Sequence, residues 1–350
     1  MKRFMKSLAI VLAATVFVGS FCGCDAGGTR DKIETIKIGV TLYRKDDTFI
    51  SSICTYLEKA AKQMETETGK KIIVNIVDGQ SSQALQNDQV ESFISQSYDV
   101  ICVNMVDRTA AAVIVDKAKT ASIPVIFFNR EPVEEDLRLW SRAYYVGADA
   151  AESGQLQGEI IANAYKSNHA AIDKNGDGKI QYVMLEGEQG HQDALLRTEY
   201  SIKAITGAGI KVEKLANDTA NWQRAQGSAK MAQWLTKFGD RIEVVFCNND
   251  DMALGAIDAL KAGKQKVKPV VVGIDATESG LNAMKDGSMF GTVFNDAQKQ
   301  AKAIFDLSYS LAQRESASSR VDLQNEHYVR IPYSIVTKAN ADEILQSLRE

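Results

Sequence analysis

The chain has 350 residues, and its 41 lysine and arginine residues are nearly balanced by 45 aspartate and glutamate residues, for a net charge of −4. No basic patch or basic run appears along it, so nucleic acid is not an expected partner. The length suits two domains of ordinary size, each able to bury its own core.

The first 23 residues have the features of a secretory signal peptide. Three basic side chains precede an apolar run over residues 8–18, which is too short to cross a membrane as a helix. A glycine before Cys24 resembles the processing site of a bacterial lipoprotein, and plain cleavage that leaves a free cysteine is the alternative. We expect removal of residues 1–23, lipidation of Cys24, a polar tether over residues 24–34, and a location in the periplasm or on the outer face of the cytoplasmic membrane.

Only three cysteines follow Cys24, at positions 54, 102 and 247. Their number is odd and their spacing is unlike that of metal ligands, which argues against a disulfide framework. They lie in apolar or helical stretches, so we expect them to be buried as small hydrophobic side chains.

Strands and helices alternate from the start of the mature chain. Apolar, Val/Ile-rich strands are expected at residues 36–43, 71–78, 98–107, 123–129 and 144–149, with helices at 51–69, 81–97, 110–122 and 152–169. Continuous apolar strands separated by helices are typical of parallel sheets covered on both faces.

The alternation then restarts. The second series predicts strands at 180–187, 210–218, 242–250, 268–276 and 289–296, helices at 197–206, 222–237, 252–263, 278–286 and 297–313, and a closing strand pair within 327–338. Two successive series predict an α/β protein with two doubly wound parallel-sheet lobes.

Residues 173–181 are spaced to wrap a hard cation. Ca²⁺ loops of the EF-hand type take oxygen ligands from positions 1, 3, 5, 7 and 9, with glycine at position 6. The glycine is Gly178, and the oxygen positions hold Asp173, Asn175, Asp177, Lys179 through its backbone carbonyl, and Gln181. Position 12 is Met184, so a bidentate carboxylate must come from elsewhere in the fold. A solvated turn is the alternative, because Asp, Asn and Gly are common in loops.

Polar residues follow the apolar strands at six places. Ligands of open α/β sheets bind outside the carboxyl ends of the strands, and the residues found there are Asp47, Asn129, His191 with Asp193, Asn249, Asp275 and Asn295. One such residue alone is usually a helix cap, but six sites from both series predict a cleft lined with hydroxyl-binding groups. Arg197 could add positive charge to this cleft, or simply pair with Asp193 on an exposed helix.

Eight segments carry a family resemblance: YRKDDTF (43–49), FFNREP (127–132), DKNGDGKIQ (173–181), GEQGHQDALLRT (187–198), DTANW (218–222), FCNNDDMALGA (246–256), VVGIDA (271–276) and GTVFNDA (291–297). With them the chain resembles the bacterial periplasmic galactose/glucose-binding proteins, the sugar receptors of an ABC transporter, over residues 36 to 340. The resemblance implies the type I binding-protein fold, with two lobes joined by a three-strand hinge.

The resemblance also implies the roles of individual residues. The sugar contacts would be Asp47, Asn129, His191, Asp193, Arg197, Asn249, Asp275 and Asn295, with Phe49 and Trp222 as stacking aromatics. A core position beside Trp234 is the alternative for Trp222. The calcium ligands would be Asp173, Asn175, Asp177, Lys179 and Gln181, with Glu243 supplying the missing carboxylate. Gln192 departs from the family, which often has proline at this position.

The implied lobes each contain two segments of the chain. Residues 35–148 with 295–331 would form the N-terminal lobe, and 149–294 with 332–350 the C-terminal lobe. The chain would cross between them near residues 147–149, 293–295 and 331–333.

The expected function is extracytoplasmic binding of D-galactose or D-glucose by hinge closure. A monomer holding a structural Ca²⁺ would deliver the sugar to an ABC permease and to a chemoreceptor. The alternatives are a receptor for ribose or another pentose, and a sugar sensor for a membrane kinase. An enzyme is not expected, because the sequence has neither a GxSxG nucleophile motif nor a GxGxxG loop opening the first helix.

Overall fold

The structure is a computed structural model that describes residues 34–349. The predicted signal peptide, Cys24 and the tether as far as residue 33 lie outside the described residues. No helix in the described part is both long and apolar enough to cross a membrane. The described chain forms two lobes, each built on a parallel sheet, so the predicted fold class is confirmed.

A six-stranded parallel sheet forms the centre of the N-terminal lobe, in the order β11-β5-β4-β3-β1-β2. Its strands are β1 (Thr35–Leu42), β2 (Lys71–Asp78), β3 (Val100–Val103), β4 (Val125–Phe128), β5 (Ala143–Gly147) and β11 (Tyr328–Arg330). The edge strand β11 returns from near the end of the chain, with Tyr328 in register with Tyr145 of β5.

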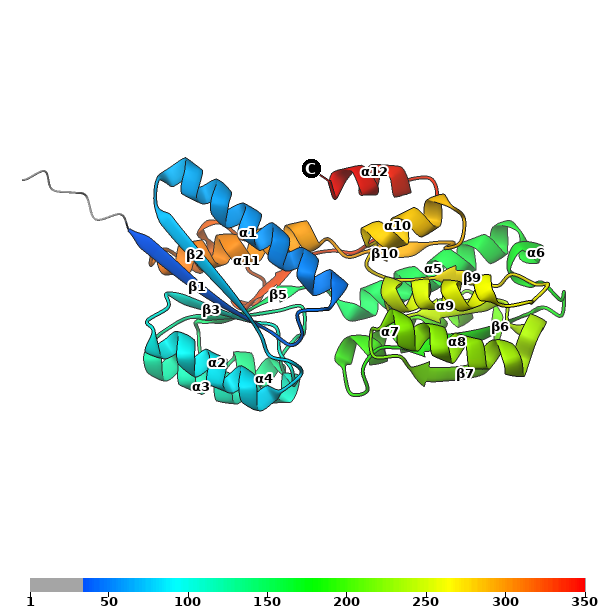
Figure 1. Cartoon of the computed structure of the whole chain (residues 1–350), viewed down its shortest axis with the longest axis horizontal. Helices are drawn as coiled ribbons and strands as arrows, with labels where there is room; N and C mark the ends of the chain where they lie inside the picture. Colours follow the sequence, from blue (N-terminus) through cyan, green and yellow to red (C-terminus); the bar gives the residue numbers. More distant parts are fainter. Residues whose placement is uncertain (1–33, 350) are drawn as a thin grey trace, which may run out of the picture. The chain divides into compact units, whose positions relative to one another are not determined.

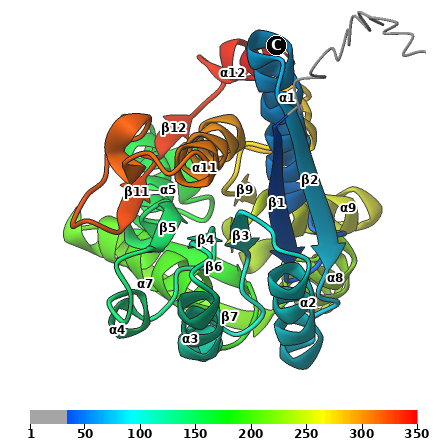
Figure 2. The same ribbon diagram turned by 90° about the vertical axis from the view of Figure 1, so that its left-hand side faces the viewer.

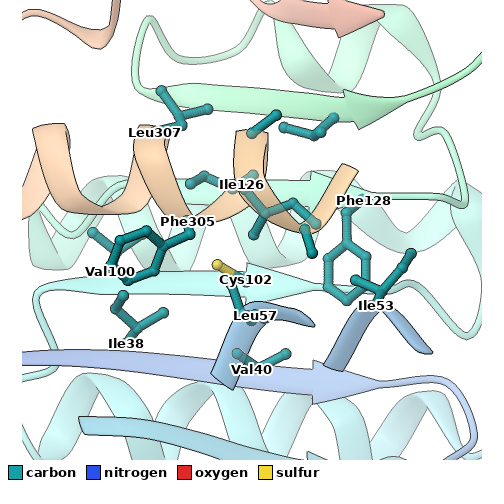
Figure 3. Packing of buried hydrophobic residues seen from close by; sticks show 14 of the residues in the cluster. Ile38, Val40, Ile53, Leu57, Val100, Cys102, Ile126, Phe128, Phe305 and Leu307 are labelled. Atoms are coloured by element: carbon teal, nitrogen blue, oxygen red, sulfur yellow. The ribbon is translucent and has the colours of Figure 1, made fainter. Parts of the chain in front are cut away.

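Helices cover both faces of this sheet (Figures 1 and 2). One face carries α1 (Thr48–Thr68) and α11 (Ala297–Ala312), and the other carries α2 (Gln83–Ser95), α3 (Ala111–Ala121) and the short α4 (Glu134–Leu137). Figure 3 shows the first face, where Phe305 and Leu307 of α11 pack over Val100 and Ile126 of the sheet. Cys102 is fully buried in the same cluster, as predicted.

The C-terminal lobe has a four-stranded parallel sheet in the order β7-β6-β8-β9. Its strands are β6 (Lys179–Glu186), β7 (Lys211–Thr219), β8 (Val244–Cys247) and β9 (Val270–Val272), and β10 (Thr292–Phe294) continues beyond β9 through isolated bridges. The helices of this lobe are α5 (Ala150–Ser167), α6 (His169–Ile172), α7 (Gln192–Gly207), α8 (Arg224–Phe238), α9 (Asp250–Ala262), α10 (Glu278–Lys285) and α12 (Ala341–Ser347). Single 3₁₀ turns occur at Arg108–Ala110, Gly239–Arg241 and Ala317–Ser319.

Three segments of the described chain connect the two lobes. They lie between β5 and α5, between β10 and α11, and between β11 and β12 (Ser334–Val336). The predicted closing strand pair is therefore wrong as a pair: β11 joins β5 of the N-terminal lobe, whereas β12 is antiparallel to β10. The apolar residues of 327–338 serve two separate cores, which periodicity alone cannot reveal.

Several elements differ from prediction at their ends. The first helix begins earlier than residue 51, because the Asp47 carboxylate accepts from the amide of Ile50 (2.9 Å) and caps it. It ends as expected at Gly69, which adopts φ 70°. The strands β3, β9 and β10 are shorter than predicted. The helices α4, α6 and α12 were not predicted.

Candidate functional site

A cavity lies between the lobes, beyond the carboxyl ends of strands from both sheets, where α/β proteins bind ligands. Its free space is about 360 Å³, part of it open to solvent. Each lobe contributes six side chains to its wall: Tyr43, Asp47, Phe49, Ile50, Asn129 and Arg130 from one, and His191, Asp193, Arg197, Trp222, Asn249 and Asp275 from the other.

Nine of the ten residues predicted to contact a ligand line this cavity, and Asn295 does not. Asn295 is 3% exposed and lies behind Asp275, donating from its amide to Asp275 Oδ1 (3.1 Å). Its own Oδ1 accepts from Gln300 (2.6 Å). In this arrangement Asn295 supports a wall residue and is not itself part of the wall.

Sequence reasoning missed three wall residues, the apolar Ile50 and the polar pair Tyr43 and Arg130. The Tyr43 hydroxyl donates to Asp47 Oδ2 (2.5 Å), which orients that carboxylate at the start of α1. The Arg130 guanidinium lies over the Tyr43 ring, 3.5 Å from its centre, and pairs across the lobes with Glu188 (2.8 Å). Both residues belong to motifs that were recognised, and their proximity to Asp47 and Asn129 was the only available signal.

Arg197 is the buried cation of the C-terminal half, with 4% of its surface exposed. Its guanidinium donates to Asp193 Oδ2 (3.2 Å), the carbonyl of Asn248 (2.9 Å), the Tyr333 hydroxyl (3.0 Å) and the Ser153 hydroxyl (3.2 Å). These partners hold the planar group in one orientation. Arg197 is therefore no exposed helix residue, although it does form the expected pair with Asp193.

Burial controls the charges of the other C-terminal wall residues. Burial raises the pKa of Asp193 and raises that of Asp275 further, while Arg197 opposes both shifts. Burial, reinforced by Arg130 and Arg197, holds the pKa of His191 well below its usual value, so the imidazole is neutral. Its Nδ1 accepts from the amide of Asp193 (3.1 Å), which leaves the proton on Nε2 as a donor.

Three residues of this wall have a positive φ, among twelve non-glycine residues of the described chain that do. Asn129 has φ 60°, Trp222 has φ 63° and Asp275 has φ 118°, although none of them is glycine. Such conformations persist only where surrounding contacts impose them, and they gather at binding sites. The helix predicted from residue 222 starts instead at Arg224, because Trp222 turns its side chain into the cavity.

The Trp222 ring is held by close packing. Its edge meets the His191 ring in a T-shaped contact with centres 5.2 Å apart. A Cβ on Gly187 would lie only 2.1 Å from the indole, so glycine is required there. The Asn249 amide also donates to the Trp222 carbonyl (3.2 Å). Trp222 belongs to the core of the lobe and to the cavity wall at once.

The predicted cation loop is a separate feature of the C-terminal lobe. The carboxylate of Asp173 accepts from the amides of Gly176 (2.7 Å) and Gly178 (2.8 Å). Asp177 accepts from the amide of Lys179 (2.9 Å) and from the Gln181 side chain (2.7 Å), and Asn175 contacts the same Gln181 side chain. These hydrogen bonds hold the carboxylate and amide side chains of the loop close together within nine residues.

Glu243 comes to this loop from the segment before β8. It is 1% exposed and accepts from the amides of Lys174 (2.6 Å), Asn175 (3.1 Å) and Gln181 (2.9 Å). Burial raises its pKa, against the effect of these amides, and the Asp173 carboxylate adds to the rise. In the described chain, no three carboxylate, imidazole or thiol groups gather closely enough to hold a metal alone. A hard cation here would also need amide and carbonyl oxygens, which such loops supply.

Comparisons with known proteins agree with this geometry. The family described as "Periplasmic binding protein domain" matches residues 38–316. The D-galactose/methyl-galactoside binding periplasmic protein MglB of Haemophilus influenzae is 40% identical over 98% of this chain and 100% of its own. A xylitol-binding protein of Mycolicibacterium smegmatis is 30% identical over 97% of this chain and 87% of its own.

Among solved structures, a solute-binding protein of an ABC transporter from Bacillus halodurans, with bound myo-inositol, superposes with a TM-score of 0.75. It is 30% identical and covers 90% of this chain and 99% of its own. The ligands of these relatives are all small polyhydroxylated molecules, and they differ from one another.

Proposed function

Because the chain belongs to the periplasmic binding proteins, which are solute receptors and not enzymes, we propose that it binds D-galactose or D-glucose outside the cytoplasmic membrane. The observation that carries this proposal is the wall of the cavity, where three carboxylates, two buried arginines and the rings of Tyr43, Phe49 and Trp222 surround a single small space. The 40% identity to MglB over nearly the whole chain supports a galactose-type ligand over the polyols of the other relatives.

The wall has the chemistry that a pyranose requires. A pyranose has apolar C–H faces, which the rings of Phe49 and Trp222 can cover. Its hydroxyls both donate and accept, so planar carboxylate, amide and guanidinium groups can bind neighbouring hydroxyls in pairs. The buried carboxylates Asp193 and Asp275 need donors, which Arg197 and the sugar hydroxyls would supply together.

Binding would proceed by closure of the two lobes around the sugar. The Arg130–Glu188 ion pair (2.8 Å) and the hydrogen bond from Thr48 to Asp251 (2.6 Å) join the lobes beside the cavity. A form without sugar would open by breaking such contacts, with movement at the three connecting segments. Closure changes the surface that an ABC permease reads, and a chemoreceptor could read the same surface of a monomer.

We also propose that the loop at 173–181, together with Glu243, holds a structural Ca²⁺. The support is that Asp173 and Asp177 belong to one loop, that Glu243 accepts from three amides of the same loop, and that none of the three carboxylates has an ion pair among the described residues. A Ca²⁺ there would neutralise these oxygens and stabilise the folded C-terminal lobe. It would take no direct part in binding sugar.

A titration of sugar-free mature protein tests the proposed ligand. We expect saturable heat and a change in Trp fluorescence with D-galactose or D-glucose, and a smaller radius of gyration in solution once the sugar is bound. Ribose, xylitol and myo-inositol are the matched competitors. Tight binding of one of these with no response to either hexose would replace the hexose proposal by that ligand.

A further inference from the structure

Asp250 lies directly behind the C-terminal wall, and its buried carboxylate does not line the cavity. Asp250 is the first residue of α9 and is fully buried. Its neighbour Asn249 lines the cavity, but Asp250 points the other way, into the loop between β9 and α10. That loop carries Asp275, so the contacts of Asp250 decide how a cavity residue is held.

Asp250 binds the Asp275 loop through both of its carboxylate oxygens. Oδ2 accepts from the amide (2.8 Å) and hydroxyl (3.3 Å) of Thr277, and the amide of Asp250 donates to the carbonyl of Ile274 (2.8 Å). Oδ1 accepts from the Thr292 hydroxyl (2.6 Å), whose oxygen lies 3.4 Å from the amide of Ala276. The segment around Asp275 is thus tied to Asp250 on both sides: Ile274 through the Asp250 backbone amide, Thr277 through the carboxylate, and Ala276 through Thr292.

The loop needs such support because its backbone is strained. Asp275 has φ 118° and Ala276 has φ 53°, two consecutive non-glycine residues in a region that L-residues avoid. Strain of this kind is retained only where neighbouring contacts impose it. Asp275 itself forms three further hydrogen bonds: its amide donates to the carbonyl of Val293 (2.8 Å), its carbonyl accepts from the backbone amide of Asn295 (3.2 Å), and its Oδ1 accepts from the Asn295 side chain (3.1 Å).

Two positions that pack against the Asp250 carboxylate can hold only glycine. A Cβ on Gly273 would lie 2.2 Å from Asp250 Oδ1, and a Cβ on Gly280 would lie 2.2 Å from Oδ2. The two glycines come from the strand end and from α10, on opposite sides of the same group. With glycine at both positions, the Asp250 side chain fits between them in this one orientation.

We propose that Asp250 is a positioning residue of the sugar site, which holds the strained turn at 275–276 so that the Asp275 carboxylate faces the cavity. The inference rests on the proposed function, because it assumes that Asp275 binds the sugar. It assigns Asp250 no contact with the sugar.

The charge of Asp250 gives this role a pH dependence. Burial raises its pKa to about 7, against the effect of Thr292 and Thr277. The titratable groups that face it are Asp251 on its own helix, the Asp275 carboxylate and the Cys247 thiol. No cation is paired with Asp250 among the described residues, and Glu278 of α10 pairs instead with Arg349.

The free energy of unfolding and the affinity for sugar should therefore respond to pH in opposite directions. The pKa of Asp250 is higher in the folded state than its usual value of 3.8. The folded state therefore loses stability as the pH rises from 3.8 to about 7, and protonation of Asp250 favours the fold. Protonation turns one carboxylate oxygen from an acceptor into a donor, so the Thr292 hydroxyl that donates to Oδ1 must reverse its hydrogen bond, and this loosens the turn. At lower pH this group should thus weaken sugar binding while it strengthens the fold.

The test compares Asp250→Asn with wild type at pH 8 and pH 6. We expect Asp250→Asn to bind the sugar at least tenfold more weakly at pH 8, with an unchanged or higher Tm and with less dependence of affinity on pH. Asp258→Asn, on the exposed part of the same helix, is the matched control and should behave as wild type. Thr292→Val should weaken binding in the same direction, and Thr292→Ser, which keeps the hydroxyl, should restore it.

Hydrogen exchange of the sugar-free protein separates this proposal from the proposed function. In Asp250→Asn the amides of residues 275–277 should exchange faster, while those of β6 and β8 stay as protected as in wild type. Wild-type exchange in this turn together with wild-type affinity would overturn the proposal, as would a joint loss of Tm, affinity and protection throughout the lobe. If wild type binds no sugar, the proposed function fails, and the exchange rates of the turn still decide the role of Asp250.

Discussion

The cavity and the cation loop show two ways of building a polar site from one chain. The loop draws its oxygens from residues 173–181 and from Glu243 alone, and the hydrogen bonds within 173–181 join residues two to six positions apart. The cavity draws on side chains from Tyr43 to Asp275, which meet only because parallel strands of both lobes end in the same place. The loop is a local structure, and the cavity is a product of the fold.

The two sites also differ in how their charges are balanced. In the cavity, Arg197 and Arg130 lie among the carboxylates, so a neutral ligand with many hydroxyls can complete the hydrogen bonds. At the loop, Asp173 and Glu243 are buried together without a paired cation in the described chain. The first arrangement suits a sugar and the second suits a metal ion. Variants of each site should therefore have separable effects.

The largest effect is expected from Arg197→Ala. It leaves Asp193 buried without its cation and removes the four hydrogen bonds of the guanidinium, and breaking a buried pair in this way costs about 3–5 kcal/mol. Sugar affinity should fall at least a hundredfold by calorimetry, and the urea midpoint should fall with it. Arg224→Ala is the control, because the exposed Arg224–Asp258 pair contributes only about 0–1 kcal/mol. Sugar affinity near that of wild type in Arg197→Ala would remove Arg197 from the site.

Removal of Ca²⁺ should act on stability alone. If free Ca²⁺ exceeds its Kd a hundredfold, binding to the folded state contributes about 2.7 kcal/mol, so a chelator should lower the Tm by several degrees. Sugar affinity at room temperature should change less than about twofold, a difference well under 1 kcal/mol.

Glu243→Gln should abolish the effect of the chelator on Tm, and Glu199→Gln, in an exposed pair with Lys203, should leave it intact. Loss of sugar binding on chelation with an unchanged Tm would contradict the separation of the two sites.

A smaller effect is expected from Gly187→Ala. The new Cβ would overlap the Trp222 ring at 2.1 Å, so the indole must move away from its place on the cavity wall. We expect about a tenfold loss of sugar affinity, equivalent to about 1.4 kcal/mol, with an unchanged response to Ca²⁺. Gly207→Ala, where a Cβ meets nothing within 4 Å, is the control, and fluorescence of Trp222 reports the displacement.

Much of the fold could be predicted because its signals are local. The Val/Ile runs and the amphipathic helices between them indicate parallel sheets covered on both faces, and Gly69 marks the end of the first helix. The spacing of the oxygen-bearing residues from Asp173 onward could also be read from the sequence, because the hydrogen bonds within this loop join residues close together in the chain. The polar residues that follow the strands could be found for the same reason.

The sequence by itself determined the two parallel-sheet lobes, the position of the polar loop at 173–181 and most residues of the cavity wall, because periodicity and motif spacing act over short distances. Only the tertiary structure decided that β11 pairs with β5 and β12 with β10, that Tyr43 orients Asp47, and that Asn295 lies behind Asp275. The same holds for Asp250, which reads in sequence as one more acidic residue at a helix start. Its contacts with Thr277 and Thr292 join segments far apart in the chain, and burial from all sides raises its pKa.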